Sequence, residues 1–275
     1  IYTAISGFGS EGPMSSAPAY DPIIQAHAGV AATQGKGDEP AFMRTLLCDK
    51  ITGYTACQAV TSALFLRERT GVGQHIDLSM IDSGLFFIFL DGFQNHTLLS
   101  DDHERGGMLI DILYDPWMCS DGGVIISAGS YEMQKRFLTS IDMQHLLEDE
   151  RFATFENQMR NIHVLKALVS ERCAELSCDD MVGRLRDVDV PCAKVMTRDE
   201  VLAQEQLLAN GTVDIYDHPI AGSSRRILAP PLFGGERLEP GSGAPTHGQH
   251  TRDVLESFGV SETDIQKLTA DGVVA

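Results

Sequence analysis

The sequence predicts an α/β protein in which a larger domain of strands and helices is followed by a smaller α+β domain. Two runs typical of strands, residues 1–6 and 76–80, stand on either side of long helical patterns. Further along, a hairpin signal precedes three segments with apolar residues at helical spacing. Strands that alternate with helices, and helices grouped after a short sheet, are the patterns of these two architectures.

The first strand leads into a glycine-rich segment that resembles a dinucleotide fingerprint. Residues 7–12 read Gly-Phe-Gly-Ser-Glu-Gly, which formally satisfies G-x-G-x-x-G. Such a fingerprint must open a helix, with an acidic residue about 20 positions on. Here Pro13 follows at once, and two further prolines come at 18 and 22. We therefore expect irregular chain and no NAD or FAD site.

Two helices are predicted in the next part of the chain, each with an aspartate at its start. Asp21 followed by Pro22 predicts an N-cap and a first helical residue, with the helix continuing to about Ala32. The second helix begins near Asp49 and ends at Gly71, where a glycine is the usual stop signal. Capping is the ordinary structural interpretation of both carboxylates.

The strand 76–80 is followed by another helix with a recognisable start. Ser79-x-x-Asp82 has the spacing of a capping box, and the apolar run 85–90 extends the helix. Asp82 and Asp91 bound this run, which is far shorter than the ~18 to 20 residues needed to span a membrane. The sequence therefore predicts a buried helix.

The second half of the chain begins with a hairpin. Residues 117–119 and 124–126 flank Ser-Asp-Gly-Gly at 120–123, a strong turn signal. Later elements are expected as helices at 132–141, 162–176, 179–186, 251–258 and 262–268, a strand at 188–195, strand-like chain at 211–233, and a second capping box from Thr197 to Glu200. The predicted domains are a large domain at 1–95, a linker at 96–107, a small α+β domain at 108–205, and at 206–275 a linker and a C-terminal return to the large domain.

Composition restricts the class of protein. The formal net charge is −18 and the pI about 4.7, which argues against nucleic acid or an anionic membrane as partner. The six cysteines show no C-x-x-C spacing and indicate reduced core residues, with neither a disulfide framework nor a metal site: Cys48, Cys57, Cys119, Cys173, Cys178 and Cys192. No secretory signal is visible at the start, so we expect a cytoplasmic protein.

Several motifs together resemble the class III CoA-transferase family. They are Tyr20-Asp21, then Cys48-Asp49-x-x-x-Gly53, then Arg67-Glu68-Arg69-Thr70-Gly71-x-Gly73-Gln74. The family includes formyl-CoA transferase, carnitine CoA-transferase and α-methylacyl-CoA racemase. The resemblance implies a Rossmann-like large domain, incomplete here because the N-terminal portion is missing from the pattern. It also implies a homodimer, which in this family is interlocked.

The resemblance further implies an enzyme that moves coenzyme A between carboxylic acids, within the class of transferases of sulfur-containing groups. Asp49 would be the catalytic nucleophile, forming an aspartyl mixed anhydride and then an aspartyl-CoA thioester. Tyr20 and Asp21 would bind and position substrate. Coenzyme A and acyl-CoA would be substrates, with no permanently bound cofactor and no metal; the residues that bind CoA are not identified on this chain.

Chemistry makes Asp49 a suitable nucleophile, although its role as a cap remains open on the residues alone. Aspartate is ionised at neutral pH and needs no general base to attack an electrophile. Backbone N–H groups of the helix start after Asp49 are candidate donors to the oxyanion of a tetrahedral intermediate. Cys48 is a second candidate nucleophile, because a helix start can lower the pKa of a thiol.

Two alternatives to the transferase remain. A racemase of the α-methylacyl-CoA type needs an acid/base on each face of the α-carbon, and Tyr20 stands where the racemases carry a histidine. Tyrosine holds its proton at neutral pH, which makes it a poor substitute. The other alternative is a non-catalytic fragment or a subunit that requires a partner. The chain also departs from the family in having only Gly106-Gly107 before the small domain, and Gly248-Gln249-His250-Thr251 near its end.

Overall fold

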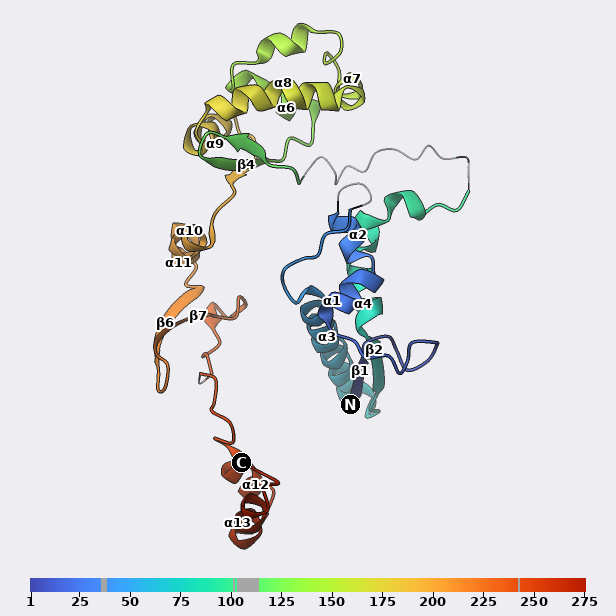
Figure 1. Ribbon diagram of the computed structural model, residues 1–275, viewed down its shortest axis with the longest axis vertical. Coiled ribbons are helices and arrows are strands. Elements are labelled where there is room, and N and C mark those ends of the chain that lie inside the picture. The colour runs from blue at the N-terminus through green and yellow to red at the C-terminus, as the bar shows by residue number, and fades with distance from the viewer. Residues whose placement is uncertain (36–38, 101, 103–113, 242) are drawn as a thin grey trace. The chain divides into compact units, whose positions relative to one another are not determined.

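The computed structural model describes residues 1–35, 39–100, 102, 114–241 and 243–275 (Figure 1). The chain divides into two compact units, residues 1–195 and residues 196–275. Helices and small sheets are mixed along its length, which confirms the predicted α/β class. The domain limits predicted from the sequence remain predictions, and residues 101 and 103–107 of the predicted linker lie outside the described residues.

Two parallel strands organise the first part of the chain. Strand β1 (Tyr2–Ser6) pairs with β2 (His75–Ser79) along its full length, from Tyr2 opposite His75 to Ser6 opposite Ser79. Parallel neighbours need a crossover connection. That connection contains α1 (Asp21–His27), α2 (Val30–Gln34) and the long α3 (Leu47–Thr70), and β2 runs directly into α4 (Met80–Gly92), with a 3-10 turn η1 (Gln94–His96) after it.

Local capping signals in this part are confirmed. Ser79 is the N-cap of α4, and its hydroxyl oxygen accepts the Asp82 backbone N–H at 3.1 Å. Gly71 ends α3 in the left-handed region, with φ of 73°, and its N–H donates to the Arg67 carbonyl. The glycine-rich segment at 7–12 opens no helix, as expected, because the next helix begins only at Asp21.

The single helix expected from Asp21 to about Ala32 is wrong in two respects. Its N-cap is Tyr20, so Asp21 is the first residue inside α1. The helix also stops at His27, because Gly29 adopts φ of 83° and redirects the chain before α2. Glycine takes this left-handed conformation at little steric cost. A Cβ added at Gly29 would lie 2.7 Å from the ring of Phe93, which fixes glycine here by space as well.

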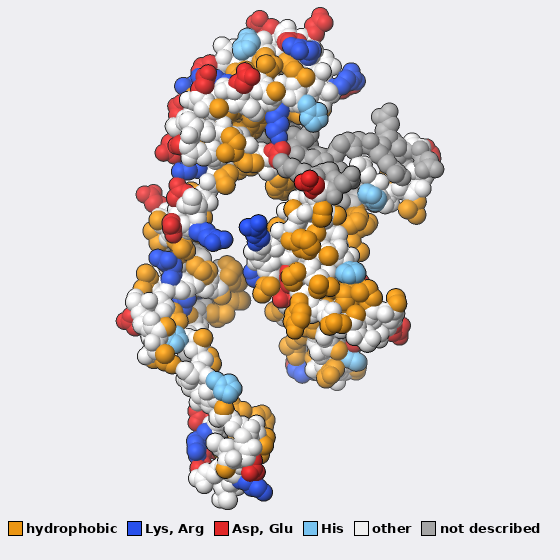
Figure 2. Space-filling view, viewed as in Figure 1, with side chains coloured by type: hydrophobic (Ala, Val, Ile, Leu, Met, Phe, Trp, Pro, Cys, Tyr) orange, Lys and Arg blue, Asp and Glu red, His pale blue; other side chains and the backbone are white. Residues whose placement is uncertain are grey.

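The prediction that the apolar helix after β2 is buried is also wrong. In α4 only Ser83 and Gly84 are buried, whereas Phe86 is 85% and Leu90 81% exposed. A helix that is apolar all round can turn only one side toward its neighbours, and here that side carries the small residues. Figure 2 shows apolar side chains spread over this part of the molecule.

A helix that crosses a membrane must be both long and apolar. Helix α3 has 24 residues but mixes apolar with polar and charged residues, and the apolar α4 has only 13. In the described ranges, no helix meets the length and apolarity requirements for crossing a membrane.

A second set of elements forms around a three-stranded antiparallel sheet. The hairpin β3 (Trp117–Cys119) and β4 (Gly122–Ile126) forms as predicted, and β5 (Cys192–Lys194) pairs with the other side of β4. Four helices accompany the sheet, together with a 3-10 turn η2 (Gln144–Glu148): α6 (Tyr131–Ser140), α7 (Phe155–Arg160), α8 (Ile162–Glu175) and α9 (Cys178–Asp187). Helices α6, α8 and α9 match the three predicted helical segments.

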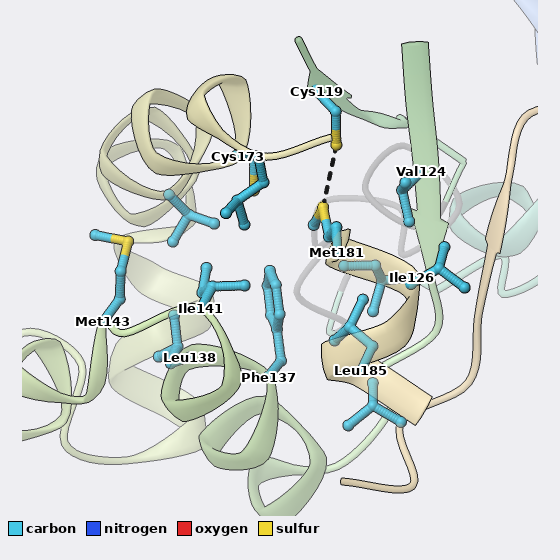
Figure 3. Packing of buried hydrophobic residues seen from close by; sticks show 14 of the residues in the cluster. Cys119, Val124, Ile126, Phe137, Leu138, Ile141, Met143, Cys173, Met181 and Leu185 are labelled. Carbon is cyan, nitrogen blue, oxygen red and sulfur yellow. Dashed lines mark hydrogen bonds between the residues drawn. The ribbon is translucent and has the colours of Figure 1, made fainter. Parts of the chain in front are cut away.

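These elements enclose the largest apolar core (Figure 3). Side chains from β4, α6, α8 and α9 meet there, and Val124 and Val169 are fully buried. Cys119 and Met181 place their sulfur atoms 3.3 Å apart inside this core. The predicted core positions of Cys48, Cys119, Cys173 and Cys178 are therefore confirmed, whereas that of Cys57 is wrong because its side chain is exposed.

Truncation of Phe152 should show how much this core stabilises the fold. Its side chain is fully buried, so Phe152→Ala should lower the free energy of unfolding by about 3–5 kcal/mol. Phe155 is 41% exposed, and Phe155→Ala should cost about 1 kcal/mol or less. Urea denaturation followed by fluorescence of Trp117, the single tryptophan of the sequence, measures both. Equal losses in the two variants would contradict the burial of Phe152.

The second unit contains short elements. The predicted capping box is present: Thr197 is the N-cap of α10 (Arg198–Ala203), and the Glu200 carboxylate accepts the Thr197 N–H at 2.7 Å. The remaining elements are α11 (Glu205–Ala209), the hairpin of β6 (Val213–His218) and β7 (Gly222–Ile227), the pair β8 (Leu232–Phe233) and β9 (Glu236–Arg237), and the helices α12 (Thr251–Ser257) and α13 (Glu262–Ala270).

Candidate active site

Asp49 lies in the first turn of α3, as its third residue. The helix begins at Leu47, and Leu46 occupies the N-cap position. The apolar side chain of Leu46 makes no capping hydrogen bond. The prediction that Asp49 is the N-cap is therefore wrong, because the chain enters helical geometry two residues earlier. The carboxylate of Asp49 is exposed, and this part of the helix carries the positive end of its dipole.

The carboxylate that caps this helix start belongs to Asp21. Asp21 is 1% exposed, and its Oδ2 accepts the backbone N–H of Asp49 at 3.1 Å. Its Oδ1 accepts the side-chain N–H of Gln25 at 2.5 Å. A buried carboxylate needs such donors, since an unpaired buried charge is costly. Asp21 thus begins one helix and caps another, and it fixes the backbone of Asp49 directly.

Gln25 completes this hydrogen-bond network, although the sequence indicates no special role for it. It is 1% exposed, and its amide nitrogen lies 3.1 Å from the carbonyl oxygens of both Met43 and Thr45. Its amide oxygen accepts the Met43 N–H at 3.0 Å. Gln25 therefore ties the segment that leads into α3 to α1. The sequence signal for this role is the position of Gln25 four residues after Asp21, which places both side chains on the same side of a helix.

The network is supported by tight packing between α1, α3 and α4. Ile24, Ala28 and Cys48 are buried together, and Gly84 of α4 lies against them. A Cβ added at Gly84 would be 3.1 Å from Ala28 Cβ and 3.3 Å from Cys48 Sγ. Such contacts leave almost no free space. The start of α3 is therefore held by packing against α1 and α4 as well as by the hydrogen bond to Asp21.

Cys48 does not have the properties of a nucleophile. Its side chain is fully buried, and this burial, together with the negative charges of Asp21 and Asp49, raises the pKa of the thiol to about 11. The sequence argument expects a lower thiol pKa at a helix start, and that expectation is wrong. The cause is that desolvation and two carboxylates outweigh the helix dipole.

Alkylation should distinguish Cys48 from Cys57, an exposed cysteine on the same helix. With iodoacetamide at pH 8, the folded protein should be modified at Cys57 and remain unmodified at Cys48, because a thiol with a pKa of about 11 stays protonated. Peptide mass spectrometry at several times measures both sites in one sample. Modification of Cys48 at the rate of Cys57 would contradict this environment.

Tyr20 stands next to the network with its ring in solvent. It is the N-cap of α1 in extended conformation, and it is 78% exposed. Tyr20 is therefore not part of the apolar core. His27, the last residue of α1, is also exposed, and its ring contacts Phe8 edge-to-face at 5.3 Å between centroids. The structure thus joins Asp21 to Asp49 and leaves the Tyr20 ring accessible.

The expected oxyanion donors at the start of α3 are already used. The Asp49 N–H donates to Asp21, and the Lys50 N–H donates to the Leu46 carbonyl at 3.3 Å. The expectation that N–H groups following Asp49 are free is therefore wrong for this helix. Among the described residues, no group of three histidine, cysteine or acidic side chains is placed to hold a metal ion.

Comparison with known proteins places this arrangement in a family. The model of CoA-transferase family III matches residues 1–251. The chain is similar to an acyl-CoA transferase of Fusarium pseudograminearum, at 27% identity over 279 aligned residues that include 100% of this chain and 61% of that protein. It is also similar to succinyl-CoA:glutarate CoA-transferase of Mus musculus, at 26% identity over 100% of this chain and 64% of that protein. The chain therefore spans less than two thirds of these relatives.

Solved structures show the same fold. A CAIB/BAIF family protein from Brucella suis superimposes with a TM-score of 0.77 at 28% identity, covering 94% of this chain and 67% of that one. Rv3272 from Mycobacterium tuberculosis superimposes with a TM-score of 0.76 at 22% identity, covering 91% and 67%. The family match over most of the sequence shows that the chain belongs to CoA-transferase family III.

Proposed function

We propose that the protein transfers coenzyme A from an acyl-CoA to a second carboxylic acid, with Asp49 as covalent nucleophile. The observation that carries the proposal is an exposed carboxylate whose own backbone is held by the buried Asp21. Family membership supports it, as do the similar proteins that are named as CoA-transferases. The identity of the two acids is left to experiment.

The reaction begins when an Asp49 oxygen attacks the thioester carbonyl of the donor. The C–S bond breaks, CoA leaves as its thiolate, and a mixed anhydride joins Asp49 to the donor acyl group. The thiolate then attacks the Asp49 carbonyl carbon and releases the donor acid as its carboxylate. The product of this first half is an aspartyl-CoA thioester.

The second half repeats these steps with the acceptor acid. Its carboxylate attacks the Asp49 thioester carbonyl and displaces the CoA thiolate, which gives a second mixed anhydride. The thiolate attacks the acceptor carbonyl, so the acceptor leaves as its CoA thioester and Asp49 is regenerated. A carboxylate suits this exchange because an anhydride is activated toward thiolates, whereas a serine ester would be too stable to react onward.

Asp21, Gln25 and Tyr20 take different supporting roles in this proposal. Both carboxylate oxygens of Asp21 already accept hydrogen bonds from protein groups, so Asp21 serves the substrate by holding Asp49. Gln25 holds the segment before α3 in the same network. Tyr20 is the group of this set that is free to touch the substrate, because its ring is exposed. The oxyanion donors come from outside the Asp49–Lys50 backbone.

Chemical trapping tests the covalent route. The protein, expressed with whatever sequence its gene encodes on either side, is incubated with a panel of acyl-CoAs and then with hydroxylamine. An anhydride or thioester on Asp49 is converted to a hydroxamate, which mass spectrometry detects on the Asp49 peptide. The hydroxamate should be absent without acyl-CoA and absent in Asp49→Asn.

The same samples separate the transferase from a racemase. A protein that is folded and binds acyl-CoA, forms no adduct, and exchanges the substrate α-hydrogen with D₂O would be an isomerase and would refute the proposal. The predicted homodimer and the predicted cytoplasmic location remain predictions, to be measured by light scattering and by fractionation of cells.

A further inference from the structure

A cavity lies inside the part of the chain built on β3, β4 and helices α6 to α8. Its volume is about 240 Å³, and its thirteen lining residues all fall between Trp117 and Val169. None of the candidate active-site residues is among them. The exposed Ser127 and the half-exposed Phe155 belong to the lining, so the cavity connects with solvent.

The walls of this cavity are mostly apolar. Trp117 and Phe137 form one side with their rings 5.5 Å apart, and Ile162 and Val169 of α8 form another. A water molecule is retained in a cavity only where it finds about two to four polar partners. These walls offer few, so an apolar ligand is a better occupant than water.

One polar side chain in the wall has an oxygen atom without a hydrogen-bond partner among the described residues. Gln134 of α6 lines the cavity, and its amide oxygen is buried without a donor among the described residues. The amide nitrogen donates to the Ala128 carbonyl at 3.4 Å, which favours this assignment of the amide nitrogen and oxygen. A buried acceptor without a donor is unfavourable. A donor on the ligand that reached this oxygen would remove that cost.

We propose that this cavity binds a small apolar molecule that carries one hydrogen-bond donor, received by Gln134. A cavity of about 150 Å³ takes up benzene, so 240 Å³ corresponds to roughly eight to ten non-hydrogen atoms. A medium-length alkyl chain ending in a hydroxyl has this size and chemistry. The site is independent of the proposed transfer reaction, since its lining shares no residue with the Asp49 network.

Two isomeric probes test this proposal. 1-Octanol and heptyl methyl ether have the same formula, and only the alcohol can donate a hydrogen bond. Each is titrated below its solubility limit while the fluorescence of Trp117, the single tryptophan and a residue of the cavity wall, is recorded. Octanol should give a saturable change with an affinity about 3- to 10-fold higher than the ether, as expected for one hydrogen bond.

Two variants make the result specific to the cavity. Gln134→Met keeps the shape of the side chain and removes the acceptor, so it should bind the two isomers equally. Ile162→Phe fills part of the cavity and should weaken both. If Ile162→Phe fails to fold, the proposal is still tested by the affinities of the two isomers for the wild type and for Gln134→Met. No saturable change with octanol, equal affinities for the isomers in the wild type, or a preference that survives in Gln134→Met would overturn the proposal.

Discussion

Replacement of Asp49 by asparagine should lower the turnover of CoA transfer by about 10⁶, the order of magnitude found when the nucleophile of a catalytic triad is removed. An amide cannot form the mixed anhydride, so every later step is lost. The dissociation constant for acyl-CoA should change little, because the exposed side chain at position 49 leaves the hydrogen bond from its backbone to Asp21 in place. Chromatography of the CoA thioesters gives the turnover, and calorimetry gives the dissociation constant.

A matched control removes the same charge elsewhere. Asp77 lies on β2 with its side chain 63% exposed, and Asp77→Asn should retain the turnover of the wild type. Asparagine can hydrolyse slowly to aspartate, so the mass of the Asp49→Asn protein is checked before the assay. An Asp49→Asn protein of correct mass that keeps more than about a tenth of the turnover would contradict a nucleophilic role.

The Asp21→Asn variant should lower turnover by about 10- to 100-fold while the KM for acyl-CoA stays nearly constant. Asparagine presents one oxygen and one NH₂ group where Asp21 accepts from both Gln25 and Asp49. One of these two N–H groups would then face another donor and lose its acceptor. We expect a stability loss of about 1–3 kcal/mol and an Asp49 adduct that still forms, but more slowly.

Asp121 also accepts a backbone N–H at a helix start, but outside the candidate site. It therefore serves as a control that separates an effect on the position of Asp49 from an effect on stability. Asp121 accepts the Cys178 N–H at the start of α9 at 2.7 Å, and this hydrogen bond lowers the pKa of Asp121. Its contribution to stability is therefore present above the ordinary carboxyl range and is lost as the pH falls through the lowered pKa. Asp121→Asn should lower stability and leave turnover per folded molecule unchanged. A similar loss of turnover in both variants would show that Asp21 acts only on stability.

Short-range features of the fold could be predicted from the sequence. The Ser79 cap, the stop at Gly71, the Thr197 capping box and the hairpin at 117–126 all form as expected. Each depends on residues within a few positions of one another, and the preferences of those residues act in nearly the same way in any fold. The motifs around Asp49 likewise pointed to the family that the comparisons show.

Three features of the candidate site, and the orientation of α4, were decided by contacts between distant segments. Asp21 caps the helix of Asp49 from 28 residues away, and Gln25 bonds a segment 18 to 20 residues on. Burial and two neighbouring carboxylates raise the pKa of Cys48. The small residues of α4 face its neighbours, so Phe86 faces solvent. The sequence by itself determined most of the elements, the caps formed by neighbouring residues, and the family. The tertiary structure decided which buried groups meet, because hydrogen-bond partners and desolvation depend on distances in space that local sequence patterns do not encode.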